Sequence, residues 1–301
     1  MRQKTIKAPI HCSGIALHSG SRINMVLLPA APGTGSIFRR TDQNNAEIIA
    51  NWRNVVDSSL CTTIGNANGL KIATIEHLMA AFAGLELDNV IVELDGPEVP
   101  VMDGSSAPFV SLIERVGIAD QRVTRRAIKI LKPVSVTDGN ASASFTPDDG
   151  FHLTFAIDFA SSAIQRQELT FDLDAESFKH EISSARTFGF LHEVDQLRAA
   201  GLARGGSLEN AVVISGDRVL NQEGLRYSDE FVRHKVLDAL GDLYLAGAPI
   251  IGHFHGVRSG HAMNRRLLEA LFADSSAWRP IPFPAPVPAM VCYEEPQRVR
   301  A

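Results

Sequence analysis

Residues 229–254 decide the fold, and their sequence is DEFVRHKVLDALGDLYLAGAPIIGHF. Apolar residues at helical spacing predict a helix over 229–246, which Gly247 and Pro249 end. The apolar run of residues 250–254 follows directly and predicts a buried strand. A helix that leads straight into a buried strand favours a mixed fold of helices and sheets.

The same order of elements occurs once earlier in the chain. There, residues 75–83 predict a helix that Gly84 ends, and VIVEL at 90–94 predicts a strand. A further helix follows in both copies, over 108–115 and 262–272, and the first helix of each copy contains one histidine. We therefore expect two related α+β domains that face each other across a shared site.

Further segments complete the predicted organisation. Residues 187–214 have no counterpart in the first half, so we expect an inserted lobe there. Polar residues 120–126 are interpreted as a linker. Additional strands are expected over 23–28, 127–136 and 151–159. The predicted division is a first domain over 1–122, a second domain over 127–280, and a proline-rich tail over 281–301 that forms an extended surface strap.

Length and composition limit the class of protein. With 301 residues, of which 45% are hydrophobic and 21% charged, the chain can bury two ordinary cores and has no signature of disorder. The net charge of -5 is spread along the chain without a long basic stripe, so nucleic acid is not an expected partner. The short basic cluster RVTRR at 122–126 is interpreted as solvated linker, with an anchor for an anionic ligand as the alternative.

Cysteine use and the N-terminus predict the compartment. The three cysteines, Cys12, Cys61 and Cys292, are odd in number and far apart, which argues against a disulfide framework. Residues 1–10 lack the roughly 7 to 15 apolar residues of a signal peptide, and no stretch approaches the roughly 18 apolar residues of a membrane span. We expect a cytoplasmic monomer without a membrane span.

The 229–246 helix carries a stripe of metal-binding residue types. His234, Asp238 and Asp242 follow one another at intervals of four residues, so they lie along one side of the helix. A histidine and a carboxylate one turn apart can bind one metal ion, although solvated helix polarity explains most such pairs. The functional hypothesis is that His77 completes a His-His-Asp zinc site. Glu76, beside it, would then act on the water at the metal, whereas the helix dipole alone also favours an acidic residue there.

Residues 259–262, SGHA, lead into the last predicted helix. A lone histidine near a helix start is more often structural than catalytic, and the helix dipole there disfavours its cation. A carboxylate partner reverses that preference. Asp242 can supply it to His261 if the two helices pack side by side.

Five short motifs occur in a fixed order along the chain. They are TIEHL at 74–78, MDGS at 102–105, SARTFGF at 184–190, FVRHKVLD at 231–238 and SGHA at 259–262. In residue type and order these motifs resemble the UDP-3-O-acyl-N-acetylglucosamine deacetylase family, whose members are zinc-dependent deacetylases of lipid A biosynthesis. The resemblance extends over about residues 14–272.

The resemblance implies a reaction and a set of residue roles. The implied reaction is hydrolysis of the N-acetyl group of UDP-3-O-acyl-N-acetylglucosamine, with one Zn²⁺ per chain. The implied zinc ligands are His77, His234 and Asp238. Glu76 would be the general base, and His261, paired with Asp242, would protonate the leaving amine or stabilise the oxyanion. Thr187 would hydrogen-bond the developing oxyanion.

The resemblance also implies an α+β fold of two similar layered β-α-α-β domains, with the active site between them. A small β-α-β insert in the second domain, here about residues 190–213, would form an apolar passage for the 3-O-acyl chain. Lys235 would position the substrate, and Phe188 would pack against the sugar or uridine. The other implied substrate-binding residues are Leu60, Cys61, Phe190, Val194, Ala203 and Gly260. Glu193 and Ala203 depart from the family pattern of Asp and, in some members, Cys.

Two other interpretations remain open. One is a zinc amidohydrolase that acts on another N-acyl sugar. The other is a metal-free sugar-nucleotide binding protein. A binding protein needs no base beside a metal, so this interpretation is opposed by the full set of Glu76, His77, His234, Asp238 and His261. Since a His-His-Asp site tolerates several divalent ions, Fe²⁺ is the alternative to Zn²⁺ in the cell.

Overall fold

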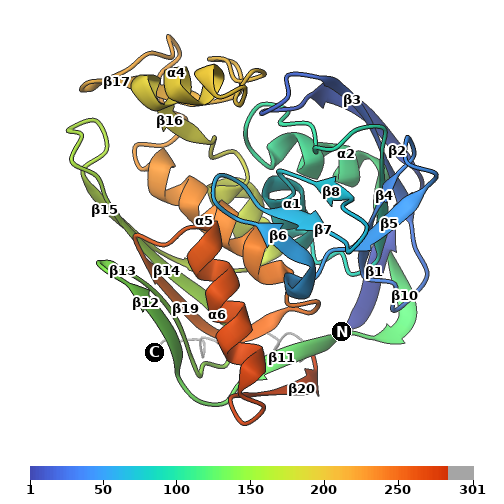
Figure 1. The fold of residues 1–301 in the computed structure, drawn as a ribbon. Helices are drawn as coiled ribbons and strands as arrows, with labels where there is room; N and C mark the ends of the chain where they lie inside the picture. Colours follow the sequence, from blue (N-terminus) through green and yellow to red (C-terminus); the bar gives the residue numbers. More distant parts are fainter. Residues whose placement is uncertain (284–301) are drawn as a thin grey trace, which may run out of the picture.

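Two sheets form the outer layers of the molecule, and helices lie between them (Figure 1). The computed structural model describes residues 1–283. The first half contributes α1 (Glu76–Gly84) and α2 (Ala107–Val116), and the second half contributes α5 (Glu230–Tyr244) and α6 (His261–Ala273). This order of sheet, helices, helices and sheet confirms the predicted α+β fold class.

The first sheet has five strands in the order β2-β3-β9-β4-β5. Only β4 and β9 pair in parallel. The strands are β2 (Ile10–Ile15), β3 (Arg22–Pro29), β9 (Val90–Leu94), β4 (Ser36–Arg40) and β5 (Ala46–Ile49). Ile23, Met25 and Leu27 of β3 are buried, as the alternation in the sequence predicts. Beside this sheet lies a short sheet of β6 (Val55–Asp57), β7 (Thr63–Gly65) and β8 (Lys71–Ile72), which follows the 3-10 turn Trp52–Asn54.

The second sheet has seven strands and centres on β19 (Ile250–Val257), which pairs with three of them. Because β19 ends just before α6, this strand sets where α6 begins. The other six strands are β11 (Arg126–Ile130), β12 (Val134–Asp138), β13 (Ala141–Thr146), β14 (Phe151–Asp158), β15 (Arg166–Asp172) and β20 (Trp278–Pro282).

The inserted lobe is a β-α-β unit. β16 (Phe188–Phe190) leads into α4 (Leu191–Ala199), and β17 (Val212–Ser215) then pairs in parallel with β16. A short β18 (Arg218–Val219) adds one antiparallel strand. The short helices α3 (Ala175–Ser177) and η2 (Phe178–Ile182) precede the lobe.

The helices α1 and α5 meet at a point where their backbones touch. A Cβ atom added to Gly241 of α5 would lie 2.1 Å from the carbonyl oxygen of Glu76. Glycine is therefore the residue that allows α5 to reach the first turn of α1. This contact brings the side of α5 that carries His234, Asp238 and Asp242 next to Glu76 and His77.

The predicted linker over 120–126 is wrong. Residues 118–124 form strand β10 (Ile118–Thr124), which pairs antiparallel with β1 (Arg2–Ile6). Arg125 is not solvated: it is 2% exposed, and its Nε donates a hydrogen bond of 2.8 Å to Asp88. A partner strand more than 100 residues away supplies the pairing, which local polarity does not reveal.

Two further expectations need correction. The predicted strand over 127–136 is two strands, β11 and β12, which pair with different neighbours on either side of Pro133. The start of the predicted tail is not a surface strap, because Pro280 and Pro282 lie in β20, which pairs antiparallel with β11. Proline lacks the N–H group of a central strand, so β20 occupies the edge of its sheet. Residues 284–301 of the predicted tail lie outside the described residues.

Candidate active site and metal centre

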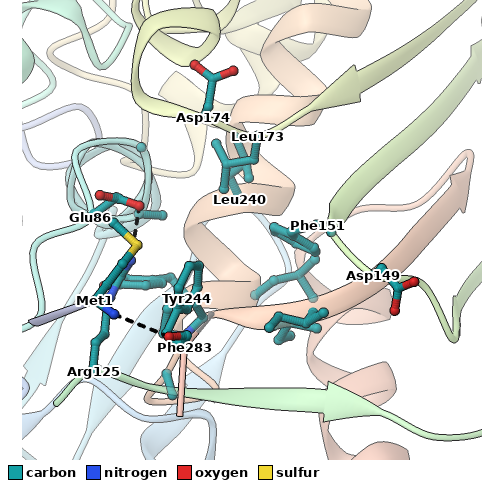
Figure 2. A pocket seen from close by; sticks show the side chains of 18 residues that line it. Met1, Glu86, Arg125, Asp149, Phe151, Leu173, Asp174, Leu240, Tyr244 and Phe283 are labelled. Carbon is teal, nitrogen blue, oxygen red and sulfur yellow. Dashed lines mark hydrogen bonds and ion pairs between the residues drawn. The ribbon is translucent and has the colours of Figure 1, made fainter. Parts of the chain in front are cut away.

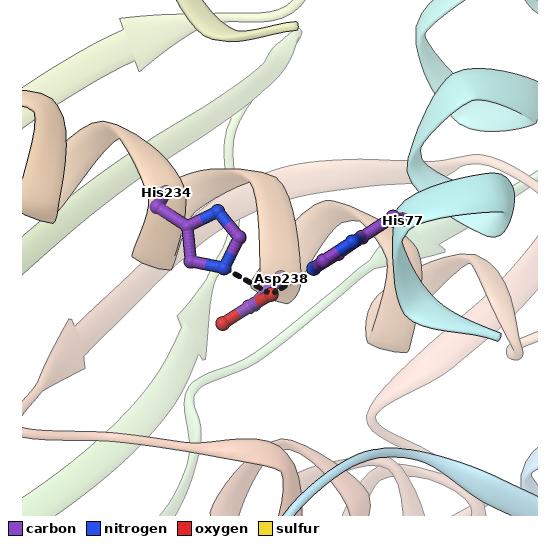
Figure 3. A group of neighbouring side chains, drawn as sticks. All are labelled: His77, His234 and Asp238. Carbon is purple, nitrogen blue, oxygen red and sulfur yellow. Dashed lines mark ion pairs between the residues drawn. The ribbon is translucent and has the colours of Figure 1, made fainter. Parts of the chain in front are cut away.

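Two helices from different halves place three metal-binding side chains together. His77 lies in the first turn of α1, and His234 and Asp238 lie one turn apart on α5. Their ligand atoms lie within 4.8 Å of one another, and each residue is at most 4% exposed. Figure 3 shows both imidazole rings beside the Asp238 carboxylate. Within residues 1–283, no other group of three His, Cys, Asp or Glu side chains converges in this way.

The donor atoms of this cluster lack the partners that a purely structural cluster needs. Oδ1 of Asp238 is buried without a hydrogen-bond partner, 3.6 Å from Nε2 of His77 and 3.3 Å from Nε2 of His234. Nδ1 of His234 donates to the carbonyl oxygen of Ala185 at 3.1 Å, which leaves a lone pair on Nε2. Because buried polar atoms are normally satisfied, this donor set fits a divalent cation.

The protonation states of the cluster also suit a cation. Burial lowers the pKa of His234 to about 4 despite the nearby carboxylate, so the ring is neutral at pH 7 and its contact with Asp238 is not an ion pair. Burial would raise the pKa of Asp238, but His234 and the Lys235 ammonium group hold that pKa well below its usual range. Nζ of Lys235 donates to Oδ2 of Asp238 at 2.6 Å. Neutral imidazole and ionised carboxylate are the forms that bind metal ions.

Glu76 is a buried carboxylate beside this cluster. The backbone N–H of Thr62 donates to its Oε2 at 3.0 Å, and Nε2 of His261 lies 3.9 Å from its Oε1. Burial raises the pKa of Glu76, because a carboxylate loses hydration away from water. A raised pKa brings this group closer to the range of a general base that works near neutral pH.

His261 and Asp242 form the predicted pair. Nδ1 of His261 donates to Oδ2 of Asp242 at 2.8 Å, and α5 packs against α6 as this contact requires. Burial alone would lower the pKa of His261, but the carboxylates of Asp242, Asp238 and Glu76 together outweigh burial and raise the pKa to about 9. His261 is therefore a cation at neutral pH, and its Nε2 is turned toward Glu76 and Asp238, at 3.9 Å and 4.0 Å.

A cavity of about 620 Å³ opens beside these groups. Phe188 forms part of an apolar wall, since its ring packs edge-on against Phe159 and Phe231 with centroids 5.8 Å and 5.0 Å away. Of the residues predicted for metal binding, catalysis or substrate binding, the cavity is lined by Leu60, Thr187, Phe188, His234, Lys235, Asp238, Gly260 and His261.

Four predicted substrate-binding residues lie outside this lining. Cys61 is buried, and burial raises the pKa of its thiol to about 12. Phe190 ends β16, Val194 lies on α4, and Ala203 lies in the following loop, where its neighbours hydrogen-bond to the first half of the chain. That these four residues bind the substrate stays a prediction.

The sequence analysis missed two residues of the site. The hydroxyl group of Thr62 donates to Oδ1 of Asp242 at 2.5 Å, and Nδ2 of Asn264 donates to Oδ2 of the same carboxylate at 2.9 Å. Asn264 lies one turn after His261 on α6, so helical spacing could have identified it. No local pattern points to Thr62, because the partners of its hydroxyl group, Asp242 and His261, lie in the distant second half.

A second cavity of about 400 Å³ lies at the C-terminal end of α5 (Figure 2). Its walls are mostly apolar. Of its charged side chains, Arg125 forms ion pairs with Glu86 and with Asp88, whereas Asp149 lies away from them. It contains none of the predicted site residues. Within the described residues, no helix has the length and apolarity to cross a membrane.

Two α+β halves that share a buried His-His-Asp cluster, with a carboxylate base candidate beside it, define a metalloenzyme. The family model described as "LpxC: UDP-3-O-acyl N-acetylglycosamine deacetylase" matches residues 3–273. The chain belongs to this family.

Curated relatives agree with this assignment over all or nearly all of their length. A protein of Vibrio parahaemolyticus named UDP-3-O-acyl-N-acetylglucosamine deacetylase is 47% identical, with 100% of both chains covered. A protein of the same name from Phenylobacterium zucineum is 50% identical over 93% of this chain and 96% of its own. One from Histophilus somni is 46% identical over 94% of each chain.

Proposed function

We propose that this chain hydrolyses the N-acetyl group of UDP-3-O-acyl-N-acetylglucosamine, which releases acetate and the free amine in lipid A biosynthesis. One observation supports this reaction above all. The buried and unpartnered Oδ1 of Asp238 faces Nε2 of His77 and Nε2 of His234, and Glu76 lies beside them. This combination serves hydrolysis, whereas binding alone needs no base beside a metal.

His77, His234 and Asp238 would hold the metal ion, for which we propose zinc, with iron(II) as the alternative in the cell. When bound, the ion supplies positive charge that polarises the amide carbonyl and makes a nearby water more acidic. Three protein ligands leave a position open for substrate and water. Lys235 keeps Asp238 ionised through its 2.6 Å hydrogen bond, and lines the cavity where it can position the substrate.

Glu76 would take a proton from the attacking water as the water oxygen bonds to the acetyl carbon. The Thr62 N–H bond to Oε2 leaves Oε1 as the oxygen that accepts the proton. The oxygen of the former carbonyl gains negative charge in this step, and the hydroxyl group of Thr187, on the cavity wall, would donate a hydrogen bond to it.

His261 would complete the reaction as the general acid. Its raised pKa of about 9 keeps it protonated at neutral pH. Its Nε2–H would deliver the proton to the glucosamine nitrogen as the bond between carbon and nitrogen breaks, which leaves acetate and a free amine. Base and acid are thus separate groups, and the pKa of each is raised: that of Glu76 moves toward the range of a general base, and that of His261 keeps the acid protonated at neutral pH.

The substrate would occupy the 620 Å³ cavity, with Phe188 against the sugar or uridine. Leu60 and Gly260 line the same cavity and would contact the substrate there. The insert over about 190–213 is proposed to hold the 3-O-acyl chain, and Phe190, Val194 and Ala203 would be its apolar contacts. Cys61 would contribute through its backbone, since its thiol is buried.

A metal analysis of purified protein combined with an acetate-release assay tests this proposal. The parent protein should carry one ion per chain and release acetate, Asp238→Ala should lose both, and the exposed control Asp217→Ala should keep both. A full metal content in Asp238→Ala would refute the ligand set. Metal without acetate release in the parent would favour a binding protein, and equal rates on simple N-acyl sugars would favour a broader amidohydrolase.

Domain bounds, compartment and assembly remain proposals. The two sheets support domains over about 1–122 and 127–280. The cytoplasm and a monomer remain the predicted compartment and assembly.

A further inference from the structure

Thr62 lies between Glu76 and His261, the base and the acid of the proposed reaction. It belongs to the loop between β6 and β7 in the first half and is 2% exposed. Its backbone N–H donates to Oε2 of Glu76 at 3.0 Å, and its hydroxyl group donates to Oδ1 of Asp242 at 2.5 Å. The hydroxyl oxygen also lies 3.3 Å from Nδ1 of His261. One buried residue therefore contacts the base and the carboxylate that holds the acid.

The hydrogen bonds of Asp242 show what the Thr62 hydroxyl contributes. Oδ2 of Asp242 accepts from Nδ1 of His261 and from Nδ2 of Asn264, at 2.8 Å and 2.9 Å. The Oδ1 atom has Thr62 as its hydrogen-bond donor among the described residues. Asp242 is 3% exposed, so water has little access to replace a lost donor. Without that hydroxyl, the carboxylate plane is held at one oxygen only.

We propose that Thr62 is a positioning residue, through which the first half of the chain fixes the Asp242 carboxylate and thereby the His261 ring relative to Glu76. This inference rests on the proposed function, because it takes Glu76 as base and His261 as acid. Thr62 is absent from the lining of the 620 Å³ cavity, so it acts through Asp242 and not on the substrate.

Substitutions at position 62 distinguish the effect of the hydroxyl group from the effect of side-chain packing. Thr62→Val keeps the side-chain volume and the N–H bond to Glu76 but removes the hydroxyl, whereas Thr62→Ser keeps the hydroxyl. Thr62→Val should lower kcat by roughly 10- to 100-fold, the range for a lost hydrogen bond to a charged group. KM should change by less than about threefold, because substrate contacts are intact. Thr62→Ser should stay within about threefold of the parent.

The neighbouring residue provides a matched control. Thr63 is buried as well, but its hydroxyl contacts the thiol of Cys61 at 3.6 Å and not the acid pair. Thr63→Val should therefore keep its kcat, and all variants should keep the parent's metal content. Equal losses in Thr62→Val and Thr62→Ser, a loss confined to KM, or a loss of metal in Thr62→Val would each overturn the proposal.

A double-variant cycle tests whether Thr62 acts through His261. In a His261→Ala background the acid is already absent, so adding Thr62→Val should lower kcat by less than about twofold. A full and multiplicative loss in the double variant would instead assign Thr62 a role that is independent of the acid, and would overturn the inference.

A spectroscopic measurement keeps this inference separate from the proposed function, because it requires no substrate. The proton on Nδ1 of His261, assigned by its disappearance in His261→Ala, should give a downfield NMR signal that is protected from exchange with water. Thr62→Val should accelerate its exchange at least about tenfold, and Thr62→Ser should restore the protection. Unchanged exchange in Thr62→Val overturns the positioning role. An absence of acetate release by the parent would refute the proposed function instead.

Discussion

Glu76 is the residue whose removal separates metal binding from catalysis. It lies beside the His-His-Asp cluster but is not part of it. Glu76→Gln should keep the metal content of the parent while kcat falls by roughly 10²- to 10⁴-fold, the range for a general base. Element analysis and steady-state kinetics on the same samples check this. Glu114→Gln, on the exposed face of α2, should leave both unchanged. Loss of metal in Glu76→Gln would instead indicate that Glu76 is a metal ligand in the parent protein.

The two proton-transfer residues predict a bell-shaped pH profile of kcat/KM. His261 must be protonated, so activity should fall as pH rises through its pKa of about 9. Glu76 must be ionised, so activity should also fall as pH drops through its raised pKa. Rates measured across the pH range for the parent and His261→Ala check this. The variant should be slow and should lack the alkaline limb. If that limb is unaltered, another group titrates there.

At the scale of elements, the structure depends on contacts that no single helix encodes. Gly241→Ala would place a methyl group 2.1 Å from the Glu76 carbonyl oxygen, so α1 and α5 must separate. We expect the free energy of unfolding to fall by about 2–3 kcal/mol, the upper range for overpacking, and activity to fall with it. Gly189→Ala is the control, because its added Cβ would have ordinary contact with Val194 at 3.6 Å. Denaturant titration of both variants checks this expectation. Equal free energies of unfolding for Gly241→Ala and Gly189→Ala would contradict it.

Helices could be predicted from the sequence more completely than sheets. Helical spacing and glycine stops placed the main helices, and the four-residue stripe on α5 placed His234, Asp238 and Asp242 on one side of it. The pairing of β10 with β1 and of β20 with β11 could not be predicted, because both join segments that are far apart in the chain. Thr62 escaped prediction for the same reason, since the partners of its hydroxyl group belong to the other half.

At the scale of the whole molecule, a bound ion would join the two halves. Because binding to the folded chain alone stabilises it, removal of metal that is present at 1,000 times its dissociation constant costs about 4 kcal/mol. We expect a chelator to lower Tm by on the order of 5–10 °C. Differential scanning calorimetry with and without chelator checks this, and Asp238→Asn should remove most of the difference. Equal Tm values for the parent in both conditions would exclude an ion shared between α1 and α5.

The division of the ligands between α1 and α5 has a consequence for the order of maturation. A nascent chain exposes His77 long before it exposes His234 and Asp238, and α5 alone offers only two of the three ligands. A complete coordination site therefore arises only after the two halves have docked. With the proposed ligand set, metal loading would follow docking of the two halves, and the fraction of loaded protein would report how many newly made molecules have docked them.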